Sequence, residues 1–166
     1  MAKPKRIIIV GHMGAGKSLL AKALAEKLNW KYVDANLGLE RFIGKRLHEI
    51  LGKQGEEALH QCEADILSYY SHKENVVLVM DDTVILTEKN RKLLSSEFVV
   101  YLKVSTPTQI ERMSYGPTSV FPIDNNQAYL DTLHDERDYL FEEVATITVD
   151  TKSIEDDVKT VLEKIE

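Results

Sequence analysis

The sequence predicts an α/β fold built on a parallel β-sheet, and three observations lead to this prediction. Short apolar runs alternate along the chain with segments whose apolar residues recur at helical spacing. The runs are apolar throughout, as expected of strands that are buried on both faces. A glycine-rich loop, residues 11–18, lies between the first apolar run and the first helical segment. Strands that alternate with helices in this way form a parallel sheet covered on both faces.

The composition predicts a single globular domain spanning residues 1–166. Hydrophobic residues make up 43% of the chain and charged residues 29%, which are ordinary values for such a domain. The formal net charge of −6 argues against nucleic acid or an anionic membrane as the main partner. No apolar run reaches membrane-spanning length, the first residues lack a signal-peptide core, and the single Cys62 excludes an internal disulfide. We therefore expect a cytoplasmic protein, and a monomer.

The glycine-rich loop reads Gly-His-Met-Gly-Ala-Gly-Lys-Ser and follows the predicted strand 6–10. This is the phosphate-binding P-loop pattern, and its position between a strand and a helix favours that interpretation over a chance glycine-rich turn. Glycines let successive backbone N–H groups converge on phosphate oxygens, and the helix that follows points its positive end at them. Lys17 would reach the β- and γ-phosphates of ATP, and the Ser18 hydroxyl would be a ligand of Mg²⁺.

The predicted nucleotide-binding residues of this loop are Gly11, Gly14, Ala15, Gly16, Lys17, Ser18 and Leu19. His12 lies at a variable position of the pattern. We expect its backbone carbonyl and amide to matter more than its ring.

The other apolar patterns predict four more strands with helices between them. The predicted strands are 30–34, 76–80, 98–102 and 146–149. The predicted helices are short ones within 35–51, then 55–70, 89–95, a helix through Arg112 capped by Thr106, one containing Tyr129 to Val144, and 154–165. Cys62 falls in the apolar pattern of helix 55–70, so we expect it to be a small core residue. Residues 115–126 carry Gly and Pro without a helical or strand period, which predicts either a functional flap or a disordered link.

Acidic residues follow two of the predicted strands. Asp34 ends the second strand, where it is either a helix cap or a functional acid. Asp81 and Asp82 follow the third strand, where they are either turn residues or part of a Walker B pattern. In a Walker B pattern, four apolar residues precede an acid that organises Mg²⁺ or its waters.

With these motifs the chain resembles the shikimate kinase family, within the P-loop kinases that are similar to nucleoside-monophosphate kinases. The resemblance rests on the P-loop and on Tyr32-Val33-Asp34, Gly55-Glu56-Glu57-Ala58-Leu59, Phe98-Val99-Val100-Tyr101-Leu102, Glu136-Arg137 and Val149-Asp150-Thr151. It implies a single-domain P-loop kinase fold with a five-stranded parallel sheet in the order 2-3-1-4-5. It also implies ATP and Mg²⁺ as cofactors and a lid, about residues 113–125, over the phosphates.

The resemblance also implies roles for single residues. Lys17 and Asp34 would be catalytic, Ser18 and Asp34 would lie at the metal, and Arg112 would stack on the adenine. Asp81 would join the metal residues if the Walker B interpretation holds. Arg137 matches an arginine that holds the substrate carboxylate, although it could instead pair with nearby acids. The predicted substrate-binding residues are Asn36, His60, Asp82 and Arg137.

Several positions depart from the family pattern. The second acid of an acid-x-acid pair is Asn36, an arginine is replaced by His60, and a glycine triplet reads Asp81-Asp82-Thr83. On a long helix, His60 is more typical of a partly exposed surface residue than of a general base, and its ring is mostly neutral at pH 7 unless its pKa is shifted. From Met113 to Glu136 the chain has no lysine or arginine, whereas the family uses lid arginines to neutralise the phosphoryl group in transfer.

Three functions compete on this evidence. The first is an enzyme that transfers the γ-phosphoryl group of ATP, with Mg²⁺, to a hydroxyl of a small molecule, with shikimate itself a poor substrate. The second is a nucleotide-binding relative that has become a binding or regulatory module. The third, a GTPase switch, fits poorly because the sequence has no Asn-Lys-x-Asp element for guanine.

Overall fold

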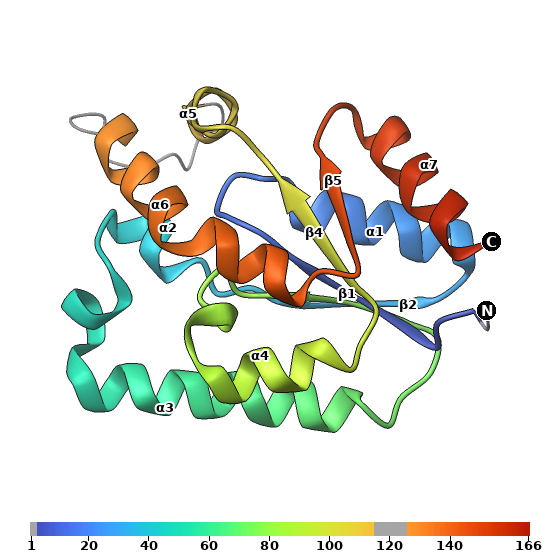
Figure 1. Ribbon diagram of the computed structural model, residues 1–166, viewed down its shortest axis with the longest axis horizontal. Helices are drawn as coiled ribbons and strands as arrows, with labels where there is room; N and C mark the ends of the chain where they lie inside the picture. The colour runs from blue at the N-terminus through green and yellow to red at the C-terminus, as the bar shows by residue number, and fades with distance from the viewer. Residues whose placement is uncertain (1–2, 115–125) are drawn as a thin grey trace.

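The sheet has five parallel strands in the order β2-β3-β1-β4-β5 (Figure 1). A computed structural model of the chain describes residues 3–114 and 126–166. The strands are β1 Arg6–Val10, β2 Lys31–Ala35, β3 Val76–Met80, β4 Val99–Lys103 and β5 Ile147–Asp150. The predicted α/β class, the parallel sheet and its strand order are confirmed.

Helices connect the strands in the predicted alternation. They are α1 Lys17–Leu28, α2 Leu39–Ile43, α3 Leu47–Tyr70, α4 Glu88–Ser95, α5 Thr106–Ser114, α6 Asn126–Val144 and α7 Ile154–Ile165, with a 3₁₀ turn η1 Val84–Leu86. Residues 115–125, most of the predicted lid, lie outside the described residues.

The sheet lies between two helical layers, each with its own apolar core. Successive side chains of a strand point to opposite faces, so Ile7 and Ile9 of β1 pack with α1 and α7. Ile8 and Val10 of the same strand pack on the other face, with α3, α4 and α6 (Figure 1). Burial on both faces explains why the central strands are apolar throughout.

Helix α3 differs from its prediction in two respects. It runs from Leu47 to Tyr70 and is interrupted where Gly52 takes φ 72°, close to the break expected between residues 51 and 55. The prediction for Cys62 is wrong, because Cys62 is exposed. The buried face of the helix carries His60, Glu63, Ala64 and Leu67 instead, so two of the residues turned to the interior are polar.

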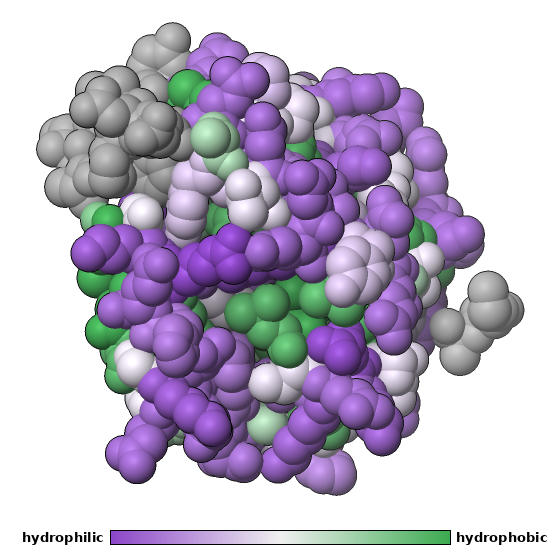
Figure 2. All heavy atoms as spheres, turned by 60° about the vertical axis from the view of Figure 1, so that its left-hand side comes forward, coloured by the Kyte–Doolittle hydropathy of each residue, from purple (hydrophilic) through white to green (hydrophobic). Residues whose placement is uncertain are grey.

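The surface is mainly hydrophilic on the face seen in Figure 2, with hydrophobic side chains gathered near the middle of the view. The large hydrophobic residues exposed on the protein include Leu37, Phe42, Ile43 and Leu51. Within residues 3–114 and 126–166, no helix has the length and apolar character needed to cross a membrane.

Candidate active site

The P-loop follows the carboxyl end of β1, and its glycines are required by close packing. Gly11 has φ 153°, and a Cβ at this position would lie 2.6 Å from the carbonyl oxygen of Leu102 on β4. Gly16 takes the left-handed conformation, φ 92°, directly before α1 begins. A side chain at either position would be strained or would clash with backbone. The loop therefore presents its backbone N–H groups where a larger residue could not.

Lys17 lies inside the loop rather than on the surface. Its Nζ donates hydrogen bonds to the carbonyl oxygens of Gly11, at 2.8 Å, and His12, at 3.0 Å. Burial lowers the pKa of Lys17, while the nearby carboxylates of Asp82 and Asp81 act in the opposite direction. The ammonium group is thus held by backbone carbonyl groups of the loop and faces two acids.

Ser18 and Asp34 form an oxygen pair beside the loop. The Ser18 hydroxyl donates to Asp34 Oδ2 at 2.6 Å, and the Tyr32 hydroxyl donates to the same oxygen at 2.9 Å. The backbone N–H of Asn36 donates to Asp34 Oδ1 at 2.9 Å, which fixes the orientation of the carboxylate. Hydroxyl and carboxylate oxygens are the ligands that Mg²⁺ prefers, so these two predicted metal residues fit that ion.

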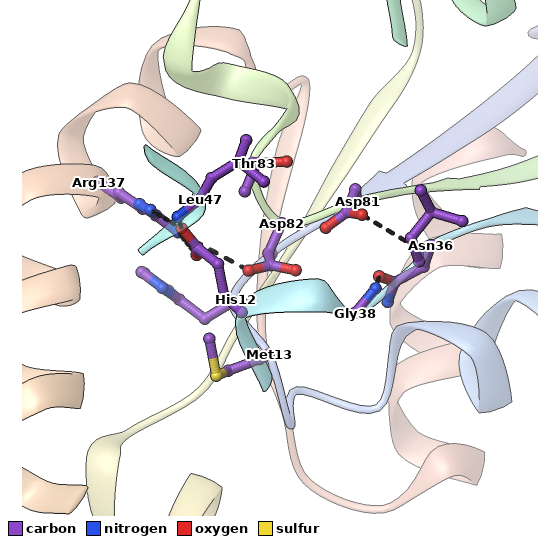
Figure 3. Close-up of polar contacts among 12 residues, drawn as sticks. His12, Met13, Asn36, Gly38, Leu47, Asp81, Asp82, Thr83 and Arg137 are labelled. Atoms are coloured by element: carbon purple, nitrogen blue, oxygen red, sulfur yellow. Dashed lines mark hydrogen bonds and ion pairs between the residues drawn. The ribbon is translucent and has the colours of Figure 1, made fainter. Parts of the chain in front are cut away.

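Asp81 and Asp82 follow β3 directly but face different neighbours (Figure 3). Asp81 Oδ2 accepts a hydrogen bond from the Leu37 N–H at 3.1 Å, whereas Asp82 faces Arg137, with its Oδ2 3.7 Å from Arg137 Nη1. Burial, then the charge of Asp82, raises the pKa of Asp81 to about 8. Despite its burial, Lys17 and other partners hold the pKa of Asp82 below its usual value.

Asn36, predicted to contact substrate, stabilises its own segment. Its Oδ1 accepts the N–H of Gly38 at 3.1 Å, in the side-chain-to-backbone pattern typical of asparagine in turns. Asn36 also lines the cavity beside the P-loop. Asn36 therefore lies on the P-loop side of the site, and its contact with substrate stays a prediction.

A cavity of about 590 Å³ extends along the P-loop and the start of α1. Its lining comprises Gly14 to Leu20, Asn36, Arg41, Arg112, Thr151 to Ile154 and Asp157. The lining thus includes all the predicted nucleotide-binding residues except Gly11. Gly11 packs instead against the backbone of Leu102 on β4. The Thr151–Ile154 segment follows β5, and ligands of open α/β sheets bind at the carboxyl ends of strands. That rule could have indicated this segment from the sequence, but Arg41 on α2 carries no comparable signal.

Arg112 joins the P-loop to the segment after β5. Its guanidinium donates to the Ala15 carbonyl at 2.6 Å, to Thr151 Oγ1 at 3.1 Å and to the Lys152 carbonyl at 3.3 Å. Arg112 thus lines the cavity beside the P-loop, and its stacking on adenine stays a prediction. These three hydrogen bonds restrain the Arg112 side chain, so it is less free to move toward the transferring phosphoryl group of a bound nucleotide.

Arg137 is buried and paired with an acid distant in sequence. Its Nη1 and Nη2 donate to Glu40 at 2.7 and 3.0 Å, across 97 residues of chain. Glu40 also accepts the Leu47 N–H at 2.7 Å, which holds α2 against the start of α3. The sequence suggests acids near Arg137 in the chain as its alternative partners. The observed partner is Glu40, which the sequence analysis misses because no local sequence pattern connects Glu40 with Arg137.

The Arg137 region retains two unsatisfied polar atoms. Asp82 Oδ2 and Arg137 Nε are buried and have no hydrogen-bond partner among the described residues. Unpaired buried polar atoms are uncommon, and each calls for an explanation such as a water or a ligand. Here one acceptor and one donor remain free on two residues predicted to bind substrate.

His60 is buried, contrary to its interpretation as a partly exposed surface residue. Its Nδ1 lies 2.6 Å from Glu63 Oε1, and Glu63 in turn accepts from Thr83 Oγ1 at 2.8 Å and Asn90 Nδ2 at 3.4 Å. Burial opposes protonation, but Glu63 and the more distant Glu56 outweigh it and raise the pKa of His60. The pKa of His60 is therefore shifted toward the charged form, which is the condition under which the ring is not expected to stay neutral.

The ring of His12 is engaged as well as its backbone. The carbonyl accepts from Lys17, as described above, but the buried ring also places Nε2 2.5 Å from Asp138 Oδ1. In Figure 3 the ring points toward the side on which Arg137 lies. The i, i+4 spacing of His134 and Asp138 on α6 could have indicated from the sequence that these two side chains lie close together. It gives no indication that His12 contacts Asp138.

Comparison with known proteins finds similarity to shikimate kinases in both sequence and structure. A family model described as shikimate kinase matches residues 13–166. A shikimate kinase of Francisella tularensis subsp. holarctica is 32% identical over 168 residues, covering 99% of this chain and 94% of the relative. The structure of shikimate kinase from Acinetobacter baumannii in complex with shikimate superposes with a TM-score of 0.79 at 29% identity, covering 98% and 93% of the two chains. Deoxyadenosine kinase from M. mycoides shares the fold alone, with a TM-score of 0.67 at 17% identity, covering 96% and 98%.

The sheet order, the P-loop at its edge and these structural neighbours define a P-loop kinase fold. Within that class, the match over residues 13–166 and the 32% identity of a full-length relative decide the family. The chain belongs to the shikimate kinase family.

Proposed function

We propose that this protein binds ATP with Mg²⁺ and transfers the γ-phosphoryl group slowly to a hydroxyl of a small molecule other than shikimate. The observation that carries the proposal is the Ser18–Asp34 contact of 2.6 Å beside the P-loop. It joins the two oxygen ligands that a P-loop kinase uses around its metal.

The residues on the nucleotide side have separable roles in this proposal. Lys17 binds the β- and γ-phosphates, and the loop N–H groups bind the remaining phosphate oxygens. Ser18 and Asp34 would hold Mg²⁺ and Asp81 would act on its waters, while the ion neutralises charge on the phosphates. Asp34 would also act near the attacking hydroxyl. Catalysis then comes mainly from positioning and charge neutralisation.

The charges around Arg137 disfavour an anionic acceptor. Glu40 engages both terminal nitrogens of the guanidinium, and Asp82 adds a second carboxylate 3.7 Å away. Two acids thus face one arginine, so a substrate carboxylate would find both terminal nitrogens of Arg137 engaged and would approach the carboxylate of Asp82. A like-charge contact at about 4 Å costs about 4 kcal/mol at an effective dielectric near 20. The protonated form favoured at His60 is engaged by Glu63 and does not replace the missing arginine.

The free donor and acceptor of this cluster suit a neutral hydroxyl group. Arg137 Nε can donate to a hydroxyl oxygen, and Asp82 Oδ2 can accept a hydroxyl hydrogen. A polyol satisfies both atoms without adding charge, and a cationic group on the acceptor would be attracted by the acids. We therefore infer that the acceptor is a neutral polyol or an amino alcohol.

A second candidate function is nucleotide binding without transfer. Residues 113–136 contain no lysine or arginine, and Arg112 is already hydrogen-bonded to three groups. Arg41, exposed at the nucleotide cavity, is the remaining arginine of that lining. If Arg41 does not reach the transferring group, the protein acts as a nucleotide-responsive binding module.

The test is an ADP-release assay across shikimate, polyols, amino alcohols and nucleosides, with ATP–Mg²⁺ binding measured in parallel. We expect ATP–Mg²⁺ binding, slow turnover with a neutral or cationic acceptor, and little with shikimate. Asp81→Gly/Asp82→Gly should improve the use of shikimate relative to wild type, because it removes the negative charge. Asp135→Asn/Glu143→Gln, at two exposed acids on α6, serves as the control for lost charge.

Each result separates the candidates. Shikimate as the best acceptor of the wild-type protein would overturn the acceptor proposal. Nucleotide binding without turnover on any acceptor, in wild type and in Arg41→Ala alike, would favour the binding module. Turnover that disappears in Arg41→Ala would assign the missing lid charge to that residue.

A further inference from the structure

Two imidazoles and a carboxylate converge behind the P-loop, outside the nucleotide and acceptor sites. His12 comes from the loop, and His134 and Asp138 come from α6; one ligand atom of each lies within 4.8 Å of the other two. We propose that these three residues bind a first-row divalent transition metal ion, with Zn²⁺ as the representative ion. The site is distinct from the proposed Mg²⁺ site because its donors include two nitrogens, whereas Mg²⁺ prefers oxygen.

The hydrogen bonds of His134 fix which of its nitrogens is free. Gln109 Nε2 donates to the Met13 carbonyl at 2.8 Å, so Gln109 Oε1 is the atom that faces His134 Nε2, at 2.6 Å. An amide oxygen can only accept, and therefore Nε2 carries the hydrogen. In the neutral ring, Nδ1 then carries a lone pair.

That lone pair faces a carboxylate oxygen. His134 Nδ1 lies 2.9 Å from Asp138 Oδ1, which also lies 2.5 Å from His12 Nε2 and accepts from the Tyr101 hydroxyl at 3.3 Å. Two acceptors at this distance repel each other unless a positive charge lies between them. A metal ion supplies that charge. Histidines that bind a metal through one ring nitrogen usually donate a hydrogen bond from the other nitrogen, as His134 Nε2 does to Gln109.

The electrostatics of the cluster suit a metal rather than two charged rings. The His12 ring is buried, whereas the Asp138 side chain is 34% exposed, so burial favours a neutral ring beside a carboxylate that water can still reach. Neutral imidazole and ionised carboxylate are the forms that bind Zn²⁺.

The site is accessible from one side and requires little movement. His134 and Asp138 line a cavity of about 370 Å³ at the carboxyl ends of β4 and β5, and the Asp138 side chain is 34% exposed. Tetrahedral Zn²⁺ at about 2.0–2.2 Å from its ligands separates them by roughly 3.3 Å. Rotation of the partly exposed Asp138 side chain can open the His12 contact to that distance. The cavity then leaves the fourth position to water or a small ligand.

An alternative without a metal is a proton on His134 that bridges it to Asp138. Asp138→Asn distinguishes the two explanations. The asparagine amide can donate to His134 Nδ1 and removes the repulsion, so the variant should fold as well as wild type. It lacks the anionic ligand, however, and should lose the metal.

The experiment uses untagged, metal-stripped protein titrated with Zn²⁺ against a chromophoric chelator and, separately, with Co²⁺ followed by visible absorption. We expect one ion per chain, a tetrahedral Co²⁺ spectrum, and no displacement by excess Mg²⁺. Asp138→Asn and His134→Gln should each weaken binding by at least about 10- to 100-fold. The exposed residues Asp135 and His72 provide the controls Asp135→Asn and His72→Gln, which should bind as wild type does. Thermal melts without metal verify that each variant is folded.

Absence of Zn²⁺ and Co²⁺ binding by the wild-type protein would overturn the proposal. So would equal binding by wild type and by folded Asp138→Asn. Because these measurements contain no nucleotide, their outcome is independent of whether the protein binds ATP.

Discussion

The proposed nucleotide side and the proposed acceptor side of the site are built by different means. On the nucleotide side, backbone carries most of the geometry: Gly11 and Gly16 adopt conformations that side chains disfavour, and Lys17 is held by two carbonyls. On the acceptor side, side chains occupy the region, with Asp82 and Arg137 facing each other at 3.7 Å. A backbone site depends on a few glycines, whereas a side-chain site changes character with each substitution.

This difference indicates how a kinase fold can keep its nucleotide and change its acceptor. Asp81-Asp82-Thr83 replaces three glycines of the family pattern, and Asp82 pairs with Arg137 while Thr83 donates to Glu63. The substituted side chains are therefore built into contacts within the protein. The predictions below test the two sides separately.

The largest expected effect concerns the rate of transfer. An arginine that neutralises the transferring phosphoryl group contributes about 10³- to 10⁵-fold in related enzymes, and residues 113–136 supply none. We expect turnover to fall below the usual kinase range of about 1–100 per second by a factor of that order, with the best acceptor of the panel. Quenched-flow measurement of a single turnover would check this, and a rate within the usual range would contradict it.

The next effect concerns the stability of the acceptor side. Arg137→Met leaves the buried Glu40 carboxylate without its partner, and breaking a buried pair in this way costs about 3–5 kcal/mol. Arg46→Met removes a pair with Glu136 of the same 2.7 Å length whose side chains are 42% and 43% exposed, so it should cost at most about 1 kcal/mol. Urea unfolding of both variants measures the difference. Equal losses of unfolding free energy in the two variants would contradict the prediction that the buried ion pair contributes more to stability than the exposed one.

A smaller effect is expected for nucleotide affinity. Lys17→Ala removes a charge-assisted contact with phosphate worth about 1.5–3 kcal/mol, which corresponds to about 10- to 150-fold in Kd for ATP–Mg²⁺. Lys22→Ala, an exposed residue on the same helix, should bind as wild type does. Titration calorimetry compares them. If Lys17→Ala binds as tightly as Lys22→Ala, the P-loop interpretation fails.

The smallest expected effect is a pH dependence on the acceptor side. Glu63 and Glu56 raise the pKa of His60 above 6.5 in the folded protein, so protonated His60 stabilises the fold. This contribution is fully present below pH 6.5 and is lost as the pH rises through the folded pKa. The stability difference between wild type and His60→Gln should therefore be larger at about pH 5.5 than at about pH 8.5. Urea unfolding at the two values measures it, and a difference that grows with pH would have the wrong sign.

The sequence alone determined the fold class, the order of the elements and the nucleotide loop. These depend on local signals: continuous apolar runs for strands buried on both faces, helical spacing, and glycines at the few positions where a side chain cannot fit. Cys62 shows the limit of such signals. It fits an apolar helical pattern, yet it is exposed because His60 and Glu63 occupy the buried face.

Only the tertiary structure decided which polar residues meet. Glu40 and Arg137 are 97 residues apart and pair in the interior, and His12 meets Asp138 across 126 residues. Neither pairing has a local pattern, because a buried ion pair or histidine cluster forms wherever folding brings its members together. The carboxyl ends of the parallel strands and the helix α6 bring these groups to one edge of the sheet, and that arrangement sets the charge of the acceptor side.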